Sequence, residues 1–232
     1  MHRKSIRPSL EPDYALMAII SAALLAATSC TNAETVVEQP RFDHVPSSCA
    51  VALNPARSDI DQFAGGLRED RDRVSTDPDP DLYEESTGVR CAAIFTGSGA
   101  WAPLDDTSLR PTSRHLFVSF AAILAADTIA DPVEYTQNLF DRRRPHGAVP
   151  RKGIGDSAYA LTTSSRYPGG ITGTVAGSVE IRFRTSNLIV KVDAGGINIH
   201  DNHEPAQLLA DLARDAEAIA TSLATHIDTV MT

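Results

Sequence analysis

Three cysteines in different contexts constrain the fold of this chain more than any other feature. Cys30 ends an apolar N-terminal stretch, whereas Cys49 and Cys91 lie further on, in sequence that has the composition of a folded domain. Two such thiols usually pair in an oxidising compartment, and closing a loop of about 42 residues stabilises a fold by about 4 kcal/mol in the chain-entropy model. We therefore predict a Cys49–Cys91 disulfide. A metal-binding or catalytic thiol pair is the weaker alternative, because no CxxC motif accompanies either cysteine.

Residues 1–29 have the layout of a signal peptide. A basic start is followed by the apolar run 15–27 and by small residues that lead into Cys30. The run has 13 residues, fewer than the roughly 20 that a membrane-spanning helix needs. We expect cleavage before Cys30 and attachment of a lipid such as palmitate, which would tether a lipoprotein to the extracytoplasmic face of the cell membrane. Ordinary cleavage near Ser29 or Ala33, which releases a secreted protein, is the alternative.

Composition limits the partners that this chain can have. The full chain has 21 basic and 30 acidic side chains; residues 1–29 hold three and two of these, so the remainder has 18 against 28, a net charge of −10. A nucleic-acid binder needs a basic face, and adhesion to anionic lipid headgroups needs basic residues as well. We therefore expect no nucleic-acid partner, and a membrane contact made through the N-terminal lipid anchor.

The chain beyond Cys30 is expected to form one domain. Segment 30–46 is polar and irregular and is predicted to be a flexible tether, followed by a single domain over 47–229. Ser58-Asp59-Ile60-Asp61 resembles a capping box, which predicts a helix that begins there and ends near Gly65-Gly66. Asp131 before Pro132 is a stronger helix start. Strands are expected within 89–95, 116–120 and 157–163.

The fold class follows from the last third of the chain. Apolar and polar residues alternate over 178–185 and again over 188–192, which predicts a hairpin that turns at Thr185-Ser186-Asn187. A helix that opens at Pro205 carries one apolar stripe, made of Leu208, Leu212, Ala216, Ile219, Leu223 and Ile227. We therefore predict an α+β fold in which an antiparallel β-sheet packs against amphipathic helices, with one face of the sheet buried and the other wet.

Several features taken together resemble a known family. These are Cys30 after small residues, Cys49, Cys91 on a strand, the loop Gly153–Ala158, a late hairpin and a terminal amphipathic helix. This combination resembles the actinobacterial secreted lipoproteins of unknown function, some of whose relatives resemble the extracellular sensor domains of bacterial serine/threonine kinases. The resemblance covers most of Cys30 to Ile227 and implies no settled activity.

Two short motifs contain residues that could bind a cofactor or a metal. The segment Gly153-x-Gly155-x-x-Ala158 matches a loose dinucleotide fingerprint, but a strand is expected after it, so we interpret it as a turn in which Asp156 bonds nearby amides. The segment His200 to Glu204 is better explained as a polar capping loop, because a metal site needs further oriented ligands. Ser98 lacks the glycine spacing of a nucleophile elbow. We expect no cofactor, no metal and no catalytic residue.

One basic cluster stands out on this acidic chain. It lies in the segment that follows the helix starting at Asp131, and it contains Arg142, Arg143, Arg144, Arg151 and Lys152. Arginine forks match phosphate and carboxylate groups, so the cluster is a candidate anion-binding site. The alternative is a solvated helix end, where cations are favourable next to the negative helix terminus.

These features favour a non-enzymatic cell-envelope lipoprotein that binds or senses an envelope protein, a lipid or a glycan. The anchor, the compact α+β pattern and the lack of a recognisable catalytic motif support this hypothesis. Two alternatives remain: an envelope hydrolase with dispersed catalytic residues, and an accessory subunit of an envelope complex or a lipid carrier. A pocket that holds a carboxylate or histidine with a strongly perturbed pKa would favour the enzyme.

Overall fold

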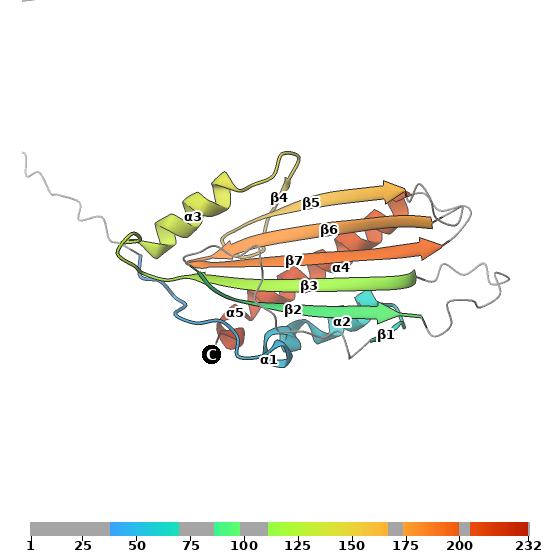
Figure 1. Ribbon diagram of the computed structural model, residues 1–232, viewed down its shortest axis with the longest axis horizontal. Coiled ribbons are helices and arrows are strands. Elements are labelled where there is room, and N and C mark those ends of the chain that lie inside the picture. The colour runs from blue at the N-terminus through green and yellow to red at the C-terminus, as the bar shows by residue number, and fades with distance from the viewer. Residues whose placement is uncertain (1–37, 70–85, 98–110, 167–173, 200–204, 232) are drawn as a thin grey trace, which may run out of the picture. The chain divides into compact units, whose positions relative to one another are not determined.

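The computed structural model describes residues 38–69, 86–97, 111–166, 174–199 and 205–231 of the chain. Contacts divide the chain into two units, Met1–Val36 and Val37–Thr232, and all described residues belong to the second. This unit contains a seven-stranded sheet in the order β1-β2-β3-β7-β6-β5-β4, and every strand pair is antiparallel (Figure 1). The predicted α+β class with an antiparallel sheet is therefore confirmed.

The element bounds match most of the predicted segments. The strands are β1 Arg68–Glu69, β2 Ser86–Thr96, β3 Pro111–Ile123, β4 Val149–Arg151, β5 Ser157–Arg166, β6 Thr174–Thr185 and β7 Leu188–Ile199. The helices are α1 Cys49–Leu53, the 3₁₀ turn η1 Asn54–Ala56, α2 Arg57–Ala64, α3 Pro132–Arg142, α4 Pro205–Thr225 and α5 Ile227–Val230. In the described part of the chain, no helix combines the length and the apolar character that crossing a membrane requires.

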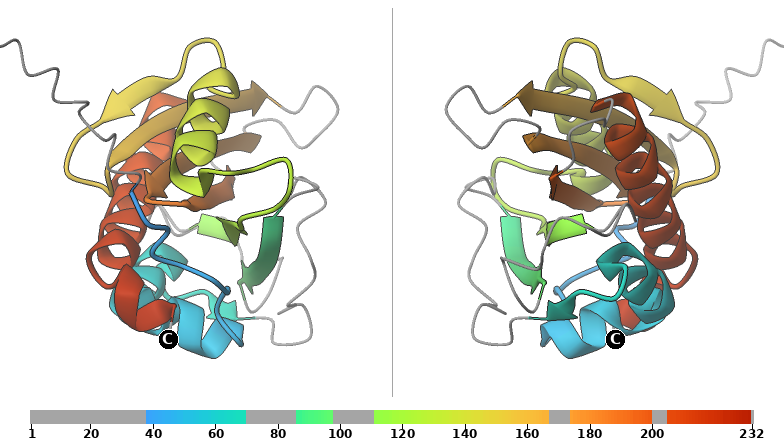
Figure 2. Two further views of the ribbon diagram at one scale, coloured as in Figure 1. Left: turned by 90° about the vertical axis from the view of Figure 1, so that its left-hand side faces the viewer. Right: turned by 90° about the vertical axis from the view of Figure 1, so that its right-hand side faces the viewer.

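The main core lies between α4 and one face of the sheet, which we call the inner face (Figure 2). The predicted apolar stripe is fully buried, from Leu208 to Leu223 in α4 and at Ile227 in α5. It packs against alternate residues of the central hairpin, Val179, Ile181, Phe183, Val190, Val192 and Ala194. Burial of a large apolar side chain contributes about 1.5–3 kcal/mol, so this packing decides which face of each strand turns inward.

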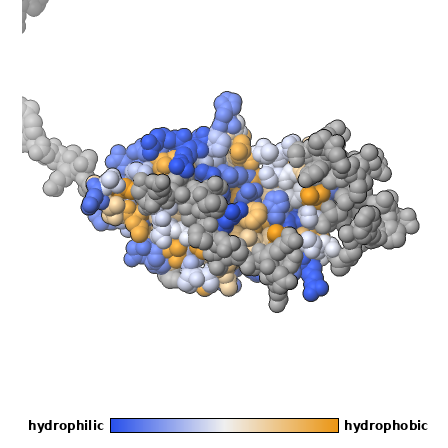
Figure 3. All heavy atoms as spheres, viewed as in Figure 1, coloured by the Kyte–Doolittle hydropathy of each residue, from blue (hydrophilic) through white to orange (hydrophobic). Residues whose placement is uncertain are grey.

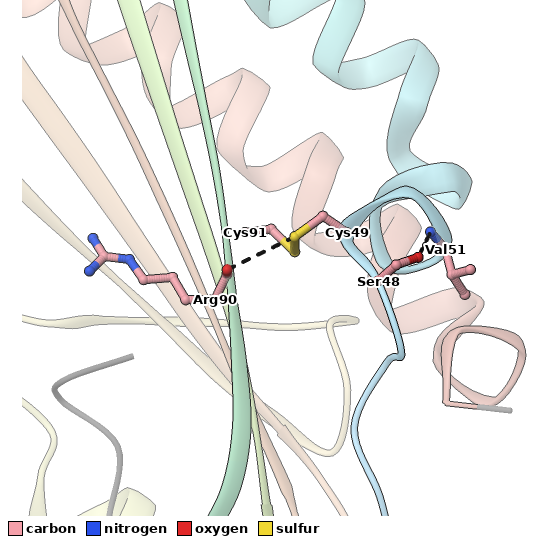
Figure 4. The surroundings of a disulfide bond; sticks show 5 residues. All are labelled: Ser48, Cys49, Val51, Arg90 and Cys91. Atoms are coloured by element: carbon pink, nitrogen blue, oxygen red, sulfur yellow. Dashed lines mark hydrogen bonds between the residues drawn. A yellow bond between two sulfur atoms is a disulfide. The ribbon is translucent and has the colours of Figure 1, made fainter. Parts of the chain in front are cut away.

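The N-terminal helices extend this core along β2. Cys49, at the start of α1, forms a disulfide with Cys91 of β2, which confirms the predicted pair (Figure 4). Phe63 of α2 packs edge to face on Phe95 of β2, with ring centroids 6.0 Å apart. Gly65 ends α2 in the left-handed conformation with φ of 60°, which glycine adopts without a steric penalty.

A second, smaller core covers one end of the opposite face, which we call the outer face. Asp131 caps α3 as predicted, since its Oδ1 accepts hydrogen bonds from the backbone N–H groups of Val133 and Glu134. Phe140 of α3 packs on Tyr159 of β5, and their ring centroids lie 5.1 Å apart. The other members of this core are Ala121, Ile123, Ile129, Leu139 and Ile189. The remainder of the outer face carries the polar residues described below.

Two local features differ from what the sequence suggests. The predicted capping box at Ser58 is wrong: α2 begins at Arg57, and the N-cap, Ala56, makes no side-chain hydrogen bond. The 3₁₀ turn that contains Pro55 leads directly into the helix, which leaves no extended residue at Ser58 to act as a cap. Phe42, inside the segment predicted as a tether, is buried and bonded to Asn187, so packing against the domain already begins there.

Candidate ligand-binding face

The outer face carries charged and polar side chains in its central part. Because successive residues of a strand point to opposite faces, the register places seven of them on one side, and we call this group the polar face: Arg90, His115, Ser119, Glu180, Arg182, Lys191 and Asp193. Figure 3 looks onto this side and shows strongly hydrophilic residues next to apolar ones. All seven are buried or half-buried, so the polar face differs from an ordinary solvated surface.

Three cations of the polar face lie in one row across neighbouring strands. Arg90 of β2 is opposite Ser119 of β3, Ser119 is opposite Lys191 of β7, and Lys191 is opposite Arg182 of β6. Directly opposite residues have Cβ atoms about 4.5–5.5 Å apart, and like charges in such pairs are destabilising. Lys191 and Arg182 form such a pair, so this part of the row is unfavourable for stability.

An acidic row lies beside the cationic one. Asp193 of β7 is opposite Glu180 of β6, and Glu180 forms an ion pair with Arg182 at 2.9 Å. Burial raises the pKa of Asp193, while the nearby charges of His115, Lys191 and Arg90 act in the opposite direction. The three cations and two carboxylates leave this part of the polar face with a net charge of +1.

Arg90 and Ser119 have polar atoms that lack hydrogen-bond partners among the described residues. The Arg90 guanidinium lies over the ring of Phe117, with Cζ 4.3 Å from the ring centroid, and its buried Nε makes no hydrogen bond to any of these residues. Figure 4 shows Arg90 and Cys91 pointing to opposite sides of β2, so the arginine belongs to the outer face. Ser119 is 3% exposed, and its Oγ makes no hydrogen bond within the described part of the chain.

Two glycines of β7 give room to side chains on opposite faces. A Cβ on Gly195 would lie 2.1 Å from Nε2 of His115, so the imidazole lies across this glycine on the outer face. A Cβ on Gly196 would lie 2.5 Å from Nη1 of Arg114, which occupies the inner face and donates to Oδ1 of Asn198. Burial lowers the pKa of His115, with Asp193 acting against this shift.

We expect Gly195→Ala to change the titration of His115. The new methyl group displaces the imidazole from its half-buried position, so the pKa of His115 rises toward its ordinary value. NMR titration of the histidine ring protons measures this change. Gly196→Ala is the control: it leaves the imidazole buried and displaces Arg114, whose charge also lowers the pKa of His115 but less than burial does, so we expect a smaller rise. Equal His115 titration curves in both variants would show that the glycine does not hold the ring in place.

The structure does not gather the predicted basic cluster into one site. Arg142 donates to the Asn138 carbonyl oxygen within α3, whereas Arg151 of β4 pairs with Glu217 of α4 at 3.5 Å. Arg144 donates to the Ala148 carbonyl oxygen and lies 5.8 Å from the ring centroid of Tyr159. Arg143, at the C-cap of α3, and Lys152 complete the cluster. These side chains turn to different neighbours, and they do not converge on a common ligand position.

The predicted turn at Gly153–Asp156 is present, whereas three other predicted features lie outside the part of the chain that the structure describes. The segment Gly153–Asp156 is a turn, as predicted: both glycines have positive φ, and Asp156 accepts a hydrogen bond from the Ser186 amide at 2.7 Å. A Cβ on Gly155 would lie 2.5 Å from the Arg184 carbonyl oxygen, so this position requires glycine. The lipidation site Cys30, the segment His200–Glu204 and Ser98 lie outside the described residues.

A groove of about 530 Å³ lies between α2 and α4, on the inner side of the sheet. Its charged groups already have partners in the protein. Asp59 accepts from Ser222 at 2.6 Å, Glu217 pairs with Arg151, and Arg214 bonds to Asp211 and Asp215. The groove therefore offers fewer unsatisfied groups to a ligand than the polar face does.

Sequence reasoning missed the polar face, although part of its signal was visible. The alternation within 178–192 already assigned Glu180, Arg182 and Lys191 to a wet face. The missing information was the strand order: β7 pairs with β3, which is far away in sequence, and this pairing aligns Arg90 and Ser119 with Lys191. A single sequence contains no direct signal for such a lateral alignment.

The comparisons with known proteins include a distant likeness to a solved structure. No family model matches the chain, and the search of curated proteins found no match. Among solved structures, the chain is similar to the extracellular domain of PknH from Mycobacterium tuberculosis, with 14% identity and a TM-score of 0.32, over 76% of this chain and 96% of that chain. Membership of a lipoprotein family stays a prediction. The likeness is too remote to transfer a site or an activity.

Proposed function

We propose that this chain is a non-enzymatic, extracytoplasmic binding module, tethered through Cys30, that takes a small polar ligand of the cell envelope on its polar face. The observation that carries the proposal is the half-buried row of cations, in which Lys191 lies opposite Arg182 and Arg90 forms no direct ion pair with any described residue. A ligand that neutralises part of this charge would relieve the repulsion. The disulfide supports the location, because such bonds persist in oxidising compartments.

The spacing of the polar face favours binding over hydrolysis. A nucleophilic serine needs a base within hydrogen-bond reach. Ser119 and His115 share a face of β3 but are four residues apart, which is about 13 Å along a strand.

A ligand panel tests the proposal on the purified full chain. Thermal unfolding is measured with inorganic phosphate, glycerol 3-phosphate, citrate, glucosamine and trehalose. A ligand at 100 times its Kd contributes about 2.7 kcal/mol, which raises Tm by about 5–10 °C for a domain of this size. We expect at least one compound to have this effect, and the absence of any stabilising compound would contradict a small polar ligand.

Two matched variants locate the binding site. Glu180→Gln/Arg182→Gln removes the ion pair of the polar face, and Asp211→Asn/Arg214→Gln removes an ion pair of similar length on α4; neither changes the net charge. We expect the first variant to lose the ligand-dependent rise in Tm and the second to keep it. The reverse result would move the site to the groove between α2 and α4, which Arg214 lines.

A further inference from the structure

We propose that Arg90, Ser119 and Lys191 form a subsite for a single phosphate group, which we call the anion subsite. The inference deepens the proposed function and rests on it, because it names the ligand chemistry of one part of the polar face. The three residues come from three neighbouring strands and lie in one row, with the serine between the two cations. A guanidinium, an ammonium and a hydroxyl group are all hydrogen-bond donors to an oxyanion.

Ser119 provides the first reason. Nearly all buried hydroxyl groups in proteins have a hydrogen-bond partner, yet the buried Oγ of Ser119 has none among the described residues. The hydroxyl lies on the floor of the row, flanked by the long and flexible side chains of Arg90 and Lys191. An anion that enters between these two side chains would accept a hydrogen bond from the Ser119 hydroxyl, which would give this buried group its partner.

Arg90 provides the second reason. The other arginines in buried or half-buried positions have an oxygen partner: Arg114 and Arg184 donate hydrogen bonds to Asn198 and Ser186, and Arg151 and Arg182 form ion pairs with Glu217 and Glu180. Arg90 instead lies over Phe117. When a guanidinium stacks on the face of a ring, its N–H groups point along the guanidinium plane and can still donate to another group. Its charge is thus oriented by the protein; it acts on the nearby Asp193 carboxylate, but no direct ion pair joins the two within the described residues.

The charge balance limits the size of the anion. The carboxylates of Asp193 and Glu180 leave the neighbouring rows with a net charge of +1, and Glu180 already pairs with Arg182. This balance suits one phosphate group and disfavours a polyanion. Arg90 and Lys191 offer donors from two sides, and Ser119 offers one from the sheet surface between them. This arrangement fits the tetrahedral oxygens of phosphate better than the planar oxygens of a carboxylate.

Binding measurements on the full chain test the anion subsite. Inorganic phosphate, glycerol 3-phosphate and acetate are titrated by calorimetry into the wild type and three variants. We expect Arg90→Gln to weaken phosphate binding at least about tenfold, since hydrogen bonds to charged groups are the stronger kind. Arg142→Gln, an exposed arginine of the predicted basic cluster, is the control and keeps the wild-type Kd. Tighter binding of glycerol 3-phosphate than of inorganic phosphate would identify an ester as the ligand.

Ser119→Ala separates a binding role from a structural one. Removing a buried hydroxyl group that has no partner leaves the stability of the free protein unchanged or raises it. The same substitution removes a donor to the anion, so we expect a higher or equal Tm without phosphate and a Kd that is weaker by about threefold. A lower Tm with unchanged phosphate binding would assign Ser119 to the fold alone.

The outcomes distinguish this inference from the proposed function. If the wild type binds neither phosphate nor glycerol 3-phosphate at millimolar concentration, or if Arg90→Gln binds phosphate as tightly as the wild type, the anion subsite is wrong. A panel compound that loses its effect in Glu180→Gln/Arg182→Gln but binds Arg90→Gln normally would still support the polar face as a ligand site. A Kd weakened equally by Arg142→Gln would show that general surface charge binds the anion.

Discussion

Replacing both Cys49 and Cys91 by alanine lowers the free energy of unfolding by about 4 kcal/mol. The disulfide closes a loop with a sequence separation of 42 residues. Without the disulfide, the unfolded chain regains the entropy of that loop, and α1 is held against β2 only by packing. Both sulfurs are buried, so the variant also loses apolar contacts that alanine does not restore.

Urea unfolding monitored by circular dichroism measures this loss. Wild-type protein treated with dithiothreitol is the control, and it should unfold at nearly the same urea concentration as the double variant. A difference of less than about 1 kcal/mol between oxidised wild type and variant would mean that the unfolded state is already compact in this region. If the reduced wild type is much more stable than the double variant, the stability lost in the variant comes mainly from missing side-chain packing and not from the disulfide.

Replacing Asn187 by alanine is expected to cost about 3–5 kcal/mol. This side chain is fully buried at the turn between β6 and β7. Its Nδ2 donates to the carbonyl oxygens of Phe42 and Ile123, and its Oδ1 accepts from the Phe42 amide. The substitution leaves three buried backbone groups without partners, and each such group costs about 1–3 kcal/mol. The lower end of the range applies if water enters the space left by the side chain.

Chemical unfolding and amide hydrogen exchange together check this prediction. The Phe42 amide should exchange much faster in Asn187→Ala, because it loses its acceptor. Asn138→Ala on the exposed side of α3 is the control and should change stability by about 0.5 kcal/mol or less. An Asn187→Ala variant as stable as this control would show that the segment around Phe42 contributes little to the fold.

The sequence predicted the parts of the fold that depend on local patterns. The stripe from Leu208 to Ile227 repeats with the period of a helix, and the hairpin alternates with the period of a strand, so both signals lie within short windows. Asp131 marked a helix start because its capping bonds reach residues only two and three positions away. The Cys49–Cys91 pair was predictable because few cysteines were available to pair.

Features that depend on contacts distant in sequence were missed. The bond between Asp59 and Ser222 joins residues 163 positions apart and gives the acid a partner that the supposed capping box at Ser58 did not predict. Phe42 was assigned to a tether because its neighbours are polar, yet Asn187 binds it from 145 positions away. The polar face depends on the pairing of β3 with β7, and so on the whole strand order.

The contacts at Phe42 and Cys49 also determine how mechanical tension would travel through this domain. A pull on the N-terminal side meets the Arg41–Asp228 ion pair and the Phe42–Asn187 hydrogen bonds before it reaches the disulfide. From Cys49 the force passes through the sulfur bridge straight into β2. The described elements between the two cysteines, including α2 and β1, are therefore bypassed and would stay folded under a pull that extends the chain ahead of them.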